Sequence, residues 1–187
     1  MEQVLHLFIT NHCRHNCELC CNKLYDIEKI PVVTVQLLKS VQTVCLTGGE
    51  PFSIDCDLLE PFINRLRRQF PNIENLYIYT SGKEIGERHH FAAQLTNARI
   101  GKRVNGINIA PKDFDDWAGF KKLLTAYPSI FDIPSSNRLY IFREQFPVFD
   151  SMKIDLSSLN INVISRQWTK TFNTPDNEHF ARLPILF

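Results

Sequence analysis

The sequence alternates short apolar runs, which end at turn-forming residues, with segments whose apolar residues have helical spacing. Runs of this length that stop at glycine, proline or small polar residues predict β-strands. The predicted strands are Val4–Ile9, Thr43–Thr47, Leu76–Thr80, Val104–Ile109, Leu139–Phe142 and Ile161–Ile164. Strands that alternate with helices form parallel sheets with right-handed crossovers. The pattern therefore predicts an α/β fold with a parallel sheet.

The helical segments between these runs differ in strength. The predicted helices cover residues 58–70, 84–95, 117–127 and a short stretch around 150–159. Pro71 ends the first of them, and Asp113 with Asp116 three residues later predicts an N-terminal cap for the third. The helix at 84–95 is a weaker candidate, and the stretch around 150–159 is poorly patterned.

Composition limits the classes of partner. The chain has 187 residues with 44% hydrophobic content, which suits one domain with a substantial core. Its 21 basic and 20 acidic residues give a formal charge of +1, so we expect no nucleic acid partner and no membrane binding. No apolar stretch reaches the roughly 18–20 residues that cross a bilayer, and no basic segment leads into a secretory core. We expect a cytosolic protein.

The cysteines are unevenly spaced. They are Cys13, Cys17, Cys20, Cys21, Cys45 and Cys56. Three of them form a C-x3-C-x2-C loop directly after the first predicted strand, a crowding that suits metal binding better than disulfide bonds in a cytosolic chain. A complete zinc or iron–sulfur site usually takes four protein ligands, so a triplet indicates a centre with one coordination position open to another molecule.

The triplet resembles the signature of the radical S-adenosylmethionine (radical SAM) family. Gly48-Gly49-Glu50-Pro51, which begins 28 residues after Cys20, resembles the GGEP motif that this family carries at the end of its second strand. The resemblance implies an open partial (β/α)6 barrel, with a [4Fe–4S] cluster held by Cys13, Cys17 and Cys20. It also implies that SAM chelates the fourth iron and that Gly48, Gly49, Glu50 and Pro51 receive its methionine part.

Three further residues are expected near SAM because they match weaker features of the family. Ser81 follows the third strand in a TNG-like turn, Asn108 lies on the fourth strand, and Arg143 ends the fifth, where it could pair with the SAM carboxylate. For Asn108 and Arg143, a role as ordinary solvated strand-end residues fits the sequence equally well. The chain departs from the family at Leu19, where an aromatic residue is common, and at Ala110, where an acid is common.

The resemblance implies a reaction but no substrate. A reduced cluster would cleave SAM to a 5′-deoxyadenosyl radical that abstracts hydrogen from a small molecule or from a peptide or protein, with flavodoxin or ferredoxin as electron donor. No cysteine follows Cys56, so auxiliary clusters are not expected, and no catalytic residue is assigned. Residues 1–168 are predicted to form the core, and residues 169–187 a tail that packs on it or acts as a lid.

A structural zinc site is the alternative for the cysteine loop. Cys21, His12 or His15 could complete it, and the protein would then be a non-enzymatic interaction module. In that case Gly48-Gly49 is an ordinary turn between strand and helix, and Glu50 is an acid at the start of a helix. Cys21 could also be an exchanged cluster ligand or a small buried residue.

Overall fold

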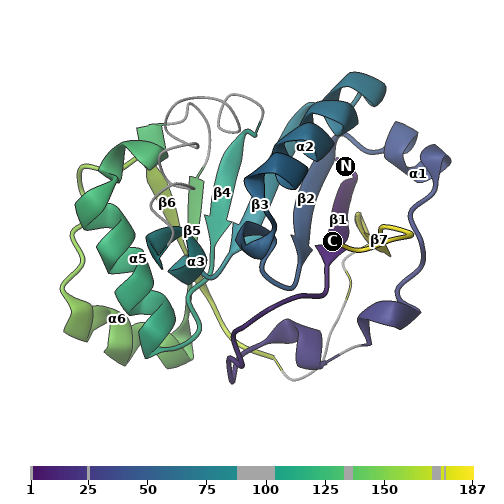
Figure 1. Cartoon of the computed structure of the whole chain (residues 1–187). Coiled ribbons are helices and arrows are strands. Elements are labelled where there is room, and N and C mark those ends of the chain that lie inside the picture. Colours follow the sequence, from purple (N-terminus) through teal and green to yellow (C-terminus); the bar gives the residue numbers. More distant parts are fainter. Residues whose placement is uncertain (1, 25, 88–103, 133–136, 170–173, 175) are drawn as a thin grey trace.

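The described strands form one parallel sheet. The computed structural model describes residues 2–24, 26–87, 104–132, 137–169, 174 and 176–187. The strands are β1 (Val4–Thr10), β2 (Thr43–Gly48), β3 (Asn75–Thr80), β4 (Gly106–Ile109), β5 (Asn137–Phe142), β6 (Ile161–Arg166) and β7 (Glu178–Arg182). Their order is β6-β5-β4-β3-β2-β1-β7 (Figure 1). The predicted parallel α/β fold is confirmed, and the sheet is open rather than closed into a barrel.

β7 is not predicted by the sequence pattern. The six strands expected from the apolar runs all form, but Glu178–Arg182, inside the predicted tail, adds a seventh beside β1 with Phe180 opposite His6. This segment has no apolar run because it lies at an edge of the sheet, where only Ala181 of the strand is buried. The predicted division of the chain at residue 168 stays a prediction.

Helices and short 3-10 turns connect the strands. The helices are α1 (Val35–Ser40), α2 (Cys56–Gln69), α3 (Lys83–Glu87), α5 (Phe114–Ala126) and α6 (Phe146–Met152). The predicted cap of α5 is confirmed, because the Asp113 carboxylate accepts a hydrogen bond from the Asp116 N–H at 2.9 Å. Residues 88–95 of the helix predicted at 84–95 lie outside the described residues.

The short helix expected around 150–159 lies earlier in the chain, as α6. It has Pro147 in its first turn, where the missing N–H costs nothing. It ends at Lys153, whose φ of 50° is left-handed and stops the helix. The sequence prediction was wrong there because the apolar residues that follow Lys153 belong to an irregular connection to β6.

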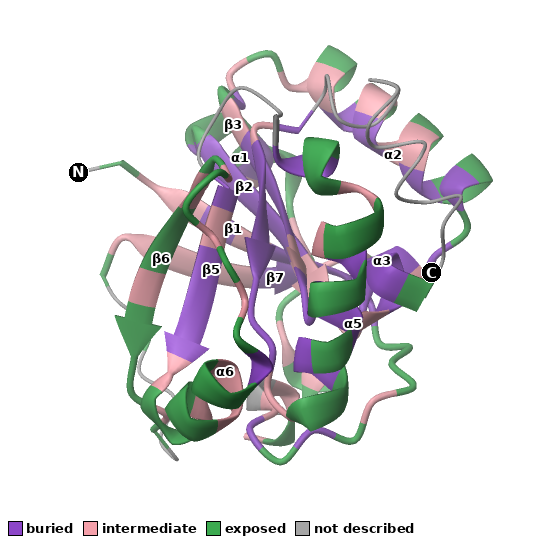
Figure 2. Ribbon diagram, turned by 90° about the vertical axis from the view of Figure 1, so that its left-hand side faces the viewer, coloured by how far each residue is buried: buried purple, intermediate pink, exposed green. Residues whose placement is uncertain are grey.

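The main core lies between the sheet and the helices on one of its faces. Alternate strand residues such as Leu5, Leu7 and Ile78 belong to one buried cluster with Leu59 and Trp117 from the helices. Helices α2, α3 and α5 lie along this side of the sheet (Figure 2). Among the residues that the structure describes, no helix has the length and apolar character needed to cross a membrane.

Because the strands are parallel, their carboxyl ends meet at one edge of the sheet. The cysteine loop follows β1, the glycine pair is at the end of β2, and Ser81 follows β3. Ligands of open α/β sheets bind at this edge. The fold therefore brings together the motifs that the sequence separates.

Candidate functional site

A pocket opens at the carboxyl ends of the central strands. The space between its lining residues amounts to about 550 Å³, part of which is open solvent. Its lining includes seven residues that the sequence predicted: Cys13, Cys17, Cys20, Gly48, Gly49, Glu50 and Ser81. Pro51, Asn108 and Arg143 were also predicted and do not line it.

The two glycines allow the cysteine loop to approach the end of β2. Gly48 has a φ of 121°, and a Cβ there would lie 2.1 Å from the Thr10 carbonyl oxygen. A Cβ on Gly49 would lie 2.0 Å from the carbonyl oxygen of His12. Backbone hydrogen bonds use this close approach, with the Gly49 N–H donating to Thr10 at 2.7 Å and the Glu50 N–H to His12 at 2.9 Å. No side chain fits at either position without a backbone shift.

The far end of the cysteine segment is attached to the same glycine. The side-chain amide of Asn22, two residues after Cys20, donates to the carbonyl oxygen of Gly48. The chain thus contacts the end of β2 both before Cys13 and after Cys20. These contacts set the position of the three thiols relative to the rest of the pocket.

Glu50 links the ends of β2 and β3. The residue is 2% exposed, and its carboxylate accepts hydrogen bonds from two backbone N–H groups, that of Phe52 at 3.1 Å and that of Ser81 at 3.0 Å. Burial raises the pKa of Glu50, while these two hydrogen bonds oppose the rise. Glu50 is also the N-cap of the 3-10 turn Pro51–Ser53, so the helix-start role considered from the sequence is present here.

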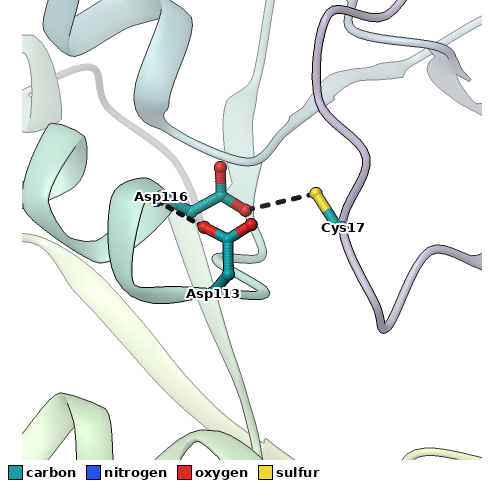
Figure 3. Close-up of side chains that lie close together, drawn as sticks. All are labelled: Cys17, Asp113 and Asp116. Carbon is teal, nitrogen blue, oxygen red and sulfur yellow. Dashed lines mark hydrogen bonds between the residues drawn. The ribbon is translucent and has the colours of Figure 1, made fainter.

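The three predicted ligands share the pocket but differ in exposure. Cys13 is exposed, Cys20 is partly buried and Cys17 is buried. Burial is the largest cause of a raised pKa at both Cys13 and Cys17, and the charge of Cys20 adds to it more weakly. Cys17 donates to the Asp116 carboxylate over 3.6 Å (Figure 3). Burial and then the charge of Asp116 raise the pKa of Cys17 to about 12.

A buried acidic cluster lies behind Cys17. His15 is 3.6 Å from Asp116 through Nδ1 and 3.6 Å from Glu84 through Nε2, and all three side chains are almost fully buried. Asp116 also accepts a hydrogen bond from the Lys112 N–H at 3.0 Å. Ligand atoms of Cys17, Asp113 and Asp116 lie within 4.8 Å of one another (Figure 3). Since Asp113 caps α5, the helix cap accounts for one contact in this group.

The remaining predicted residues lie around the pocket. Pro51 is buried in the turn after Glu50. Asn108 is fully buried in β4, and neither atom of its side-chain amide has a hydrogen-bond partner in the described part of the chain. Arg143 is exposed at the start of a 3-10 turn, Arg143–Gln145, after β5.

Two of the other cysteines, Cys45 and Cys56, are not among the residues that line the pocket. Cys45 is buried in β2, and Cys56 is buried at the start of α2. Cys21 begins the 3-10 turn Cys21–Lys23, and its side chain lies outside the described part of the structure. The sequence predicted Cys45 and Cys56 to be core or surface thiols, and both are buried.

Comparison with known proteins gave a structural match but no match to a family. No family model matches the chain, and no curated protein does. Among solved structures, a crystal structure of BtrN in complex with AdoMet and 2-DOIA has a TM-score of 0.47 and 13% sequence identity to this chain. The match covers 88% of this chain and 70% of that one.

Sequence reasoning missed several residues at the site. Asn22, Tyr79 and Lys112 line the pocket, and no motif in the sequence indicates them. The sequence suggests His15 only as an alternative zinc ligand and Asp116 only as a helix-cap partner. Their contact joins residues 101 positions apart in the chain (116 − 15), so only the folded structure reveals it.

Proposed function

We propose that the pocket holds a [4Fe–4S] cluster and SAM, and that the protein is a radical SAM enzyme. The observation that carries this proposal is the contact between the cysteine loop and the Gly48-Gly49-Glu50 segment, which line one pocket and are joined by backbone hydrogen bonds. A simple turn between strand and helix does not require two glycines placed against the segment that leads into three cysteines. The substrate is a small molecule or a peptide or protein.

Cys13, Cys17 and Cys20 would hold three irons. A [4Fe–4S] cluster that keeps one iron open for another ligand takes three thiolates from the protein. Three thiols line this pocket. Metal binding requires thiolates, so Cys17 would release its proton and turn its sulfur away from Asp116. When bound, the reduced cluster would supply one electron that breaks a carbon–sulfur bond of SAM, giving methionine and the 5′-deoxyadenosyl radical.

The chain itself would bind and orient SAM. Glu50 holds the Ser81 N–H and the turn after β2 in place, and its negative charge favours the ammonium group of methionine. Asn108 has an unpaired donor and an unpaired acceptor to offer from β4. Arg143 stays a prediction as a partner of the SAM carboxylate, with its position after β5 as its sole support.

An external protein would supply the electron. Cys13 is exposed, so a cluster bound beside it would lie near the surface, within reach of a docked one-electron donor. Flavodoxin and ferredoxin are the donors we propose. Reduction of the reconstituted protein by either one, measured as bleaching of the cluster absorbance, tests this part of the proposal.

Single cysteine substitutions test the ligand assignment. Alanine at position 13, 17 or 20 should abolish both cluster assembly, measured as iron, sulfide and visible absorbance, and the cleavage of SAM. Cys45→Ala and Cys56→Ala are matched controls, because both thiols are buried elsewhere and should leave iron content unchanged. Full cluster retention in Cys17→Ala, together with loss in Cys21→Ala, would overturn the assignment.

A zinc module is the second candidate, and the group formed by Cys17, Asp113 and Asp116 gives it some support. The cysteine triplet supports it less. Thiolates in a tetrahedral site with Zn–S bonds of about 2.3 Å lie about 3.8 Å apart, and the three sulfurs are not among the described groups within 4.8 Å. Anaerobic reconstitution separates the candidates. A brown protein with four irons and four sulfides per chain supports the enzyme, and a colourless protein with one zinc supports the module.

A further inference from the structure

A row of flat side chains crosses the sheet face that points away from α2, α3 and α5. It consists of Phe180, His6, Tyr79 and Tyr140, and we call it the aromatic row. The rings of His6 and Phe180 stack at 4.6 Å, those of His6 and Tyr79 lie 5.9 Å apart, and those of Tyr79 and Tyr140 stack at 6.0 Å. The neighbours of these residues along the strands, including Leu5, Ile78, Leu139 and Ala181, belong to the core on the other face.

Two arginines lie at the β5–β6 end of this row. The guanidinium of Arg166 lies 4.2 Å from the centre of the Tyr140 ring, and that of Arg138 lies 4.8 Å from the centre of Tyr77. In the described part of the chain, neither arginine has a carboxylate within ion-pair distance. A guanidinium that stacks on a ring still has N–H groups at its edge for a planar anion.

An acid at the β7 end of the row, Glu178, already has a partner in the described part of the chain. Glu178 in β7 lies 3.1 Å from His6 Nε2. The pKa of Glu178 is lowered, first by the hydrogen bond from His6 and more weakly by the charge of Arg166. The charges of Glu178 and Arg166 are therefore close enough to interact, but in the described part of the chain the carboxylate pairs with His6 and not with either arginine.

The aromatic row is continuous with the pocket. Tyr79 belongs to both, because it is also one of the residues that line the pocket. Tyr79, Asn108 and Arg138 are opposite one another on the adjacent strands β3, β4 and β5. Asn108, which we assign to SAM, therefore lies between Tyr79 of the pocket and Arg138. A ligand that extends along the row from Tyr79 reaches both sites.

We propose that this face binds the substrate, and that the substrate is a small planar organic anion. Its ring system would lie along His6 and Tyr79, which remain partly exposed, and its acid group would pair with Arg166 and Arg138. Offset stacking on the rings and a bidentate contact to guanidinium are both stronger when water is excluded. The role as substrate rests on the proposed function, because Tyr79 would hold the ligand next to SAM.

Binding of simple probes to the full chain tests the proposal, with 2-naphthoate and its neutral analogue 2-naphthamide titrated calorimetrically. In the metal-free protein, naphthoate should bind at least tenfold more tightly than the amide. Arg166→Met should lower this preference, because one of the two guanidinium groups is lost, and Tyr79→Leu should weaken the binding of both probes. Arg68→Met, at an exposed arginine of α2, is the matched control and should change nothing. Equal affinity for the two probes, or an unchanged preference in Arg166→Met, would overturn the proposal.

Two further outcomes separate this inference from the proposed function. In the reconstituted protein, SAM and naphthoate should bind together, and competition between them would overturn the placement of the anion beside SAM. Tetraglutamate, which has charge without rings, should bind more weakly than naphthoate, and tighter binding would overturn the planar ligand in favour of an acidic peptide. Failure of iron to load would contradict the proposed function alone, because anion selectivity is measured without metal.

Discussion

The carboxyl ends of β1, β2 and β3 differ from those of β4, β5 and β6. At the first three, every residue predicted from a motif lines the pocket except Pro51, and backbone hydrogen bonds hold the segments together. At the second three, Asn108 is buried below the pocket and Arg143 is exposed beyond it. The motif residues at the first three strands, where backbone contacts constrain the chain, thus lie at the pocket. Asn108 and Arg143, which were assigned only from their places on the fourth and fifth strands, do not line it.

Gly49→Ala should have the largest effect. The new Cβ would lie 2.0 Å from the carbonyl oxygen of His12, so the cysteine loop must move away from β2. We expect a loss of about 3 kcal/mol in the free energy of unfolding, typical of severe overpacking, measured by urea denaturation. The folded fraction should also fail to assemble the cluster.

Gly86→Ala is the matched control for this prediction. Its Cβ would lie 2.1 Å from the carbonyl oxygen of Gly119, a clash of similar size between α3 and α5. We expect similar destabilisation, but folded Gly86→Ala protein should still bind iron. Equal iron loading by folded Gly49→Ala protein would show that contact with β2 does not position the cysteines.

Glu50→Gln should have the next largest effect. Both carboxylate oxygens accept backbone hydrogen bonds, whereas glutamine offers one acceptor oxygen and would turn an N–H₂ group towards Phe52 or Ser81. One buried N–H is then unpaired, so we expect a loss of about 2 kcal/mol in unfolding free energy and weaker SAM binding. Glu74→Gln, at an exposed site, is the control. Unchanged stability in Glu50→Gln would show that this carboxylate does not hold the ends of β2 and β3 together.

Asn108→Leu should have an effect of the opposite sign. The buried amide has no partner for either of its atoms in the described part of the chain, so an apolar residue of similar size removes a desolvation penalty. Thermal and urea unfolding of the ligand-free protein should show a gain of about 1 kcal/mol, while calorimetry should show weaker SAM binding. A stabilised variant with unchanged SAM affinity would mean that Asn108 does not serve this ligand.

Arg143→Ala should have the smallest effect. Arg143 is exposed and does not line the pocket, so unfolding free energy should stay within about 0.5 kcal/mol of the parent value. We expect SAM affinity, measured by calorimetry, to fall roughly twofold or less, because an exposed ion pair contributes little. A tenfold loss would instead support the assignment of Arg143 to the SAM carboxylate and weaken the contrast between the two halves of the sheet edge.

A feature of the fold could be predicted where it leaves a local pattern in the sequence. Apolar runs located β1 to β6, because burial of a strand leaves a local pattern. β7 escaped detection because an edge strand such as Glu178–Arg182 buries little. The contacts of His15 with Glu84 and Asp116 could not be predicted, since they depend on how the cysteine loop, α3 and α5 meet in the fold. Gly48 and Gly49 lie against the segment that leads into the cysteines, where a Cβ would meet backbone atoms, and their role towards SAM stays a prediction.

Mössbauer spectroscopy of protein reconstituted with iron-57 tests the central claim most directly. If Cys13, Cys17 and Cys20 hold three irons and SAM takes the fourth, the spectrum without SAM should be that of a [4Fe–4S] cluster. Addition of SAM should then shift the signal of one iron in four and leave the other three unchanged. A cluster whose four irons are all insensitive to SAM, or a folded protein that takes up one zinc and no iron, would contradict the assignment of this pocket to a cluster and SAM.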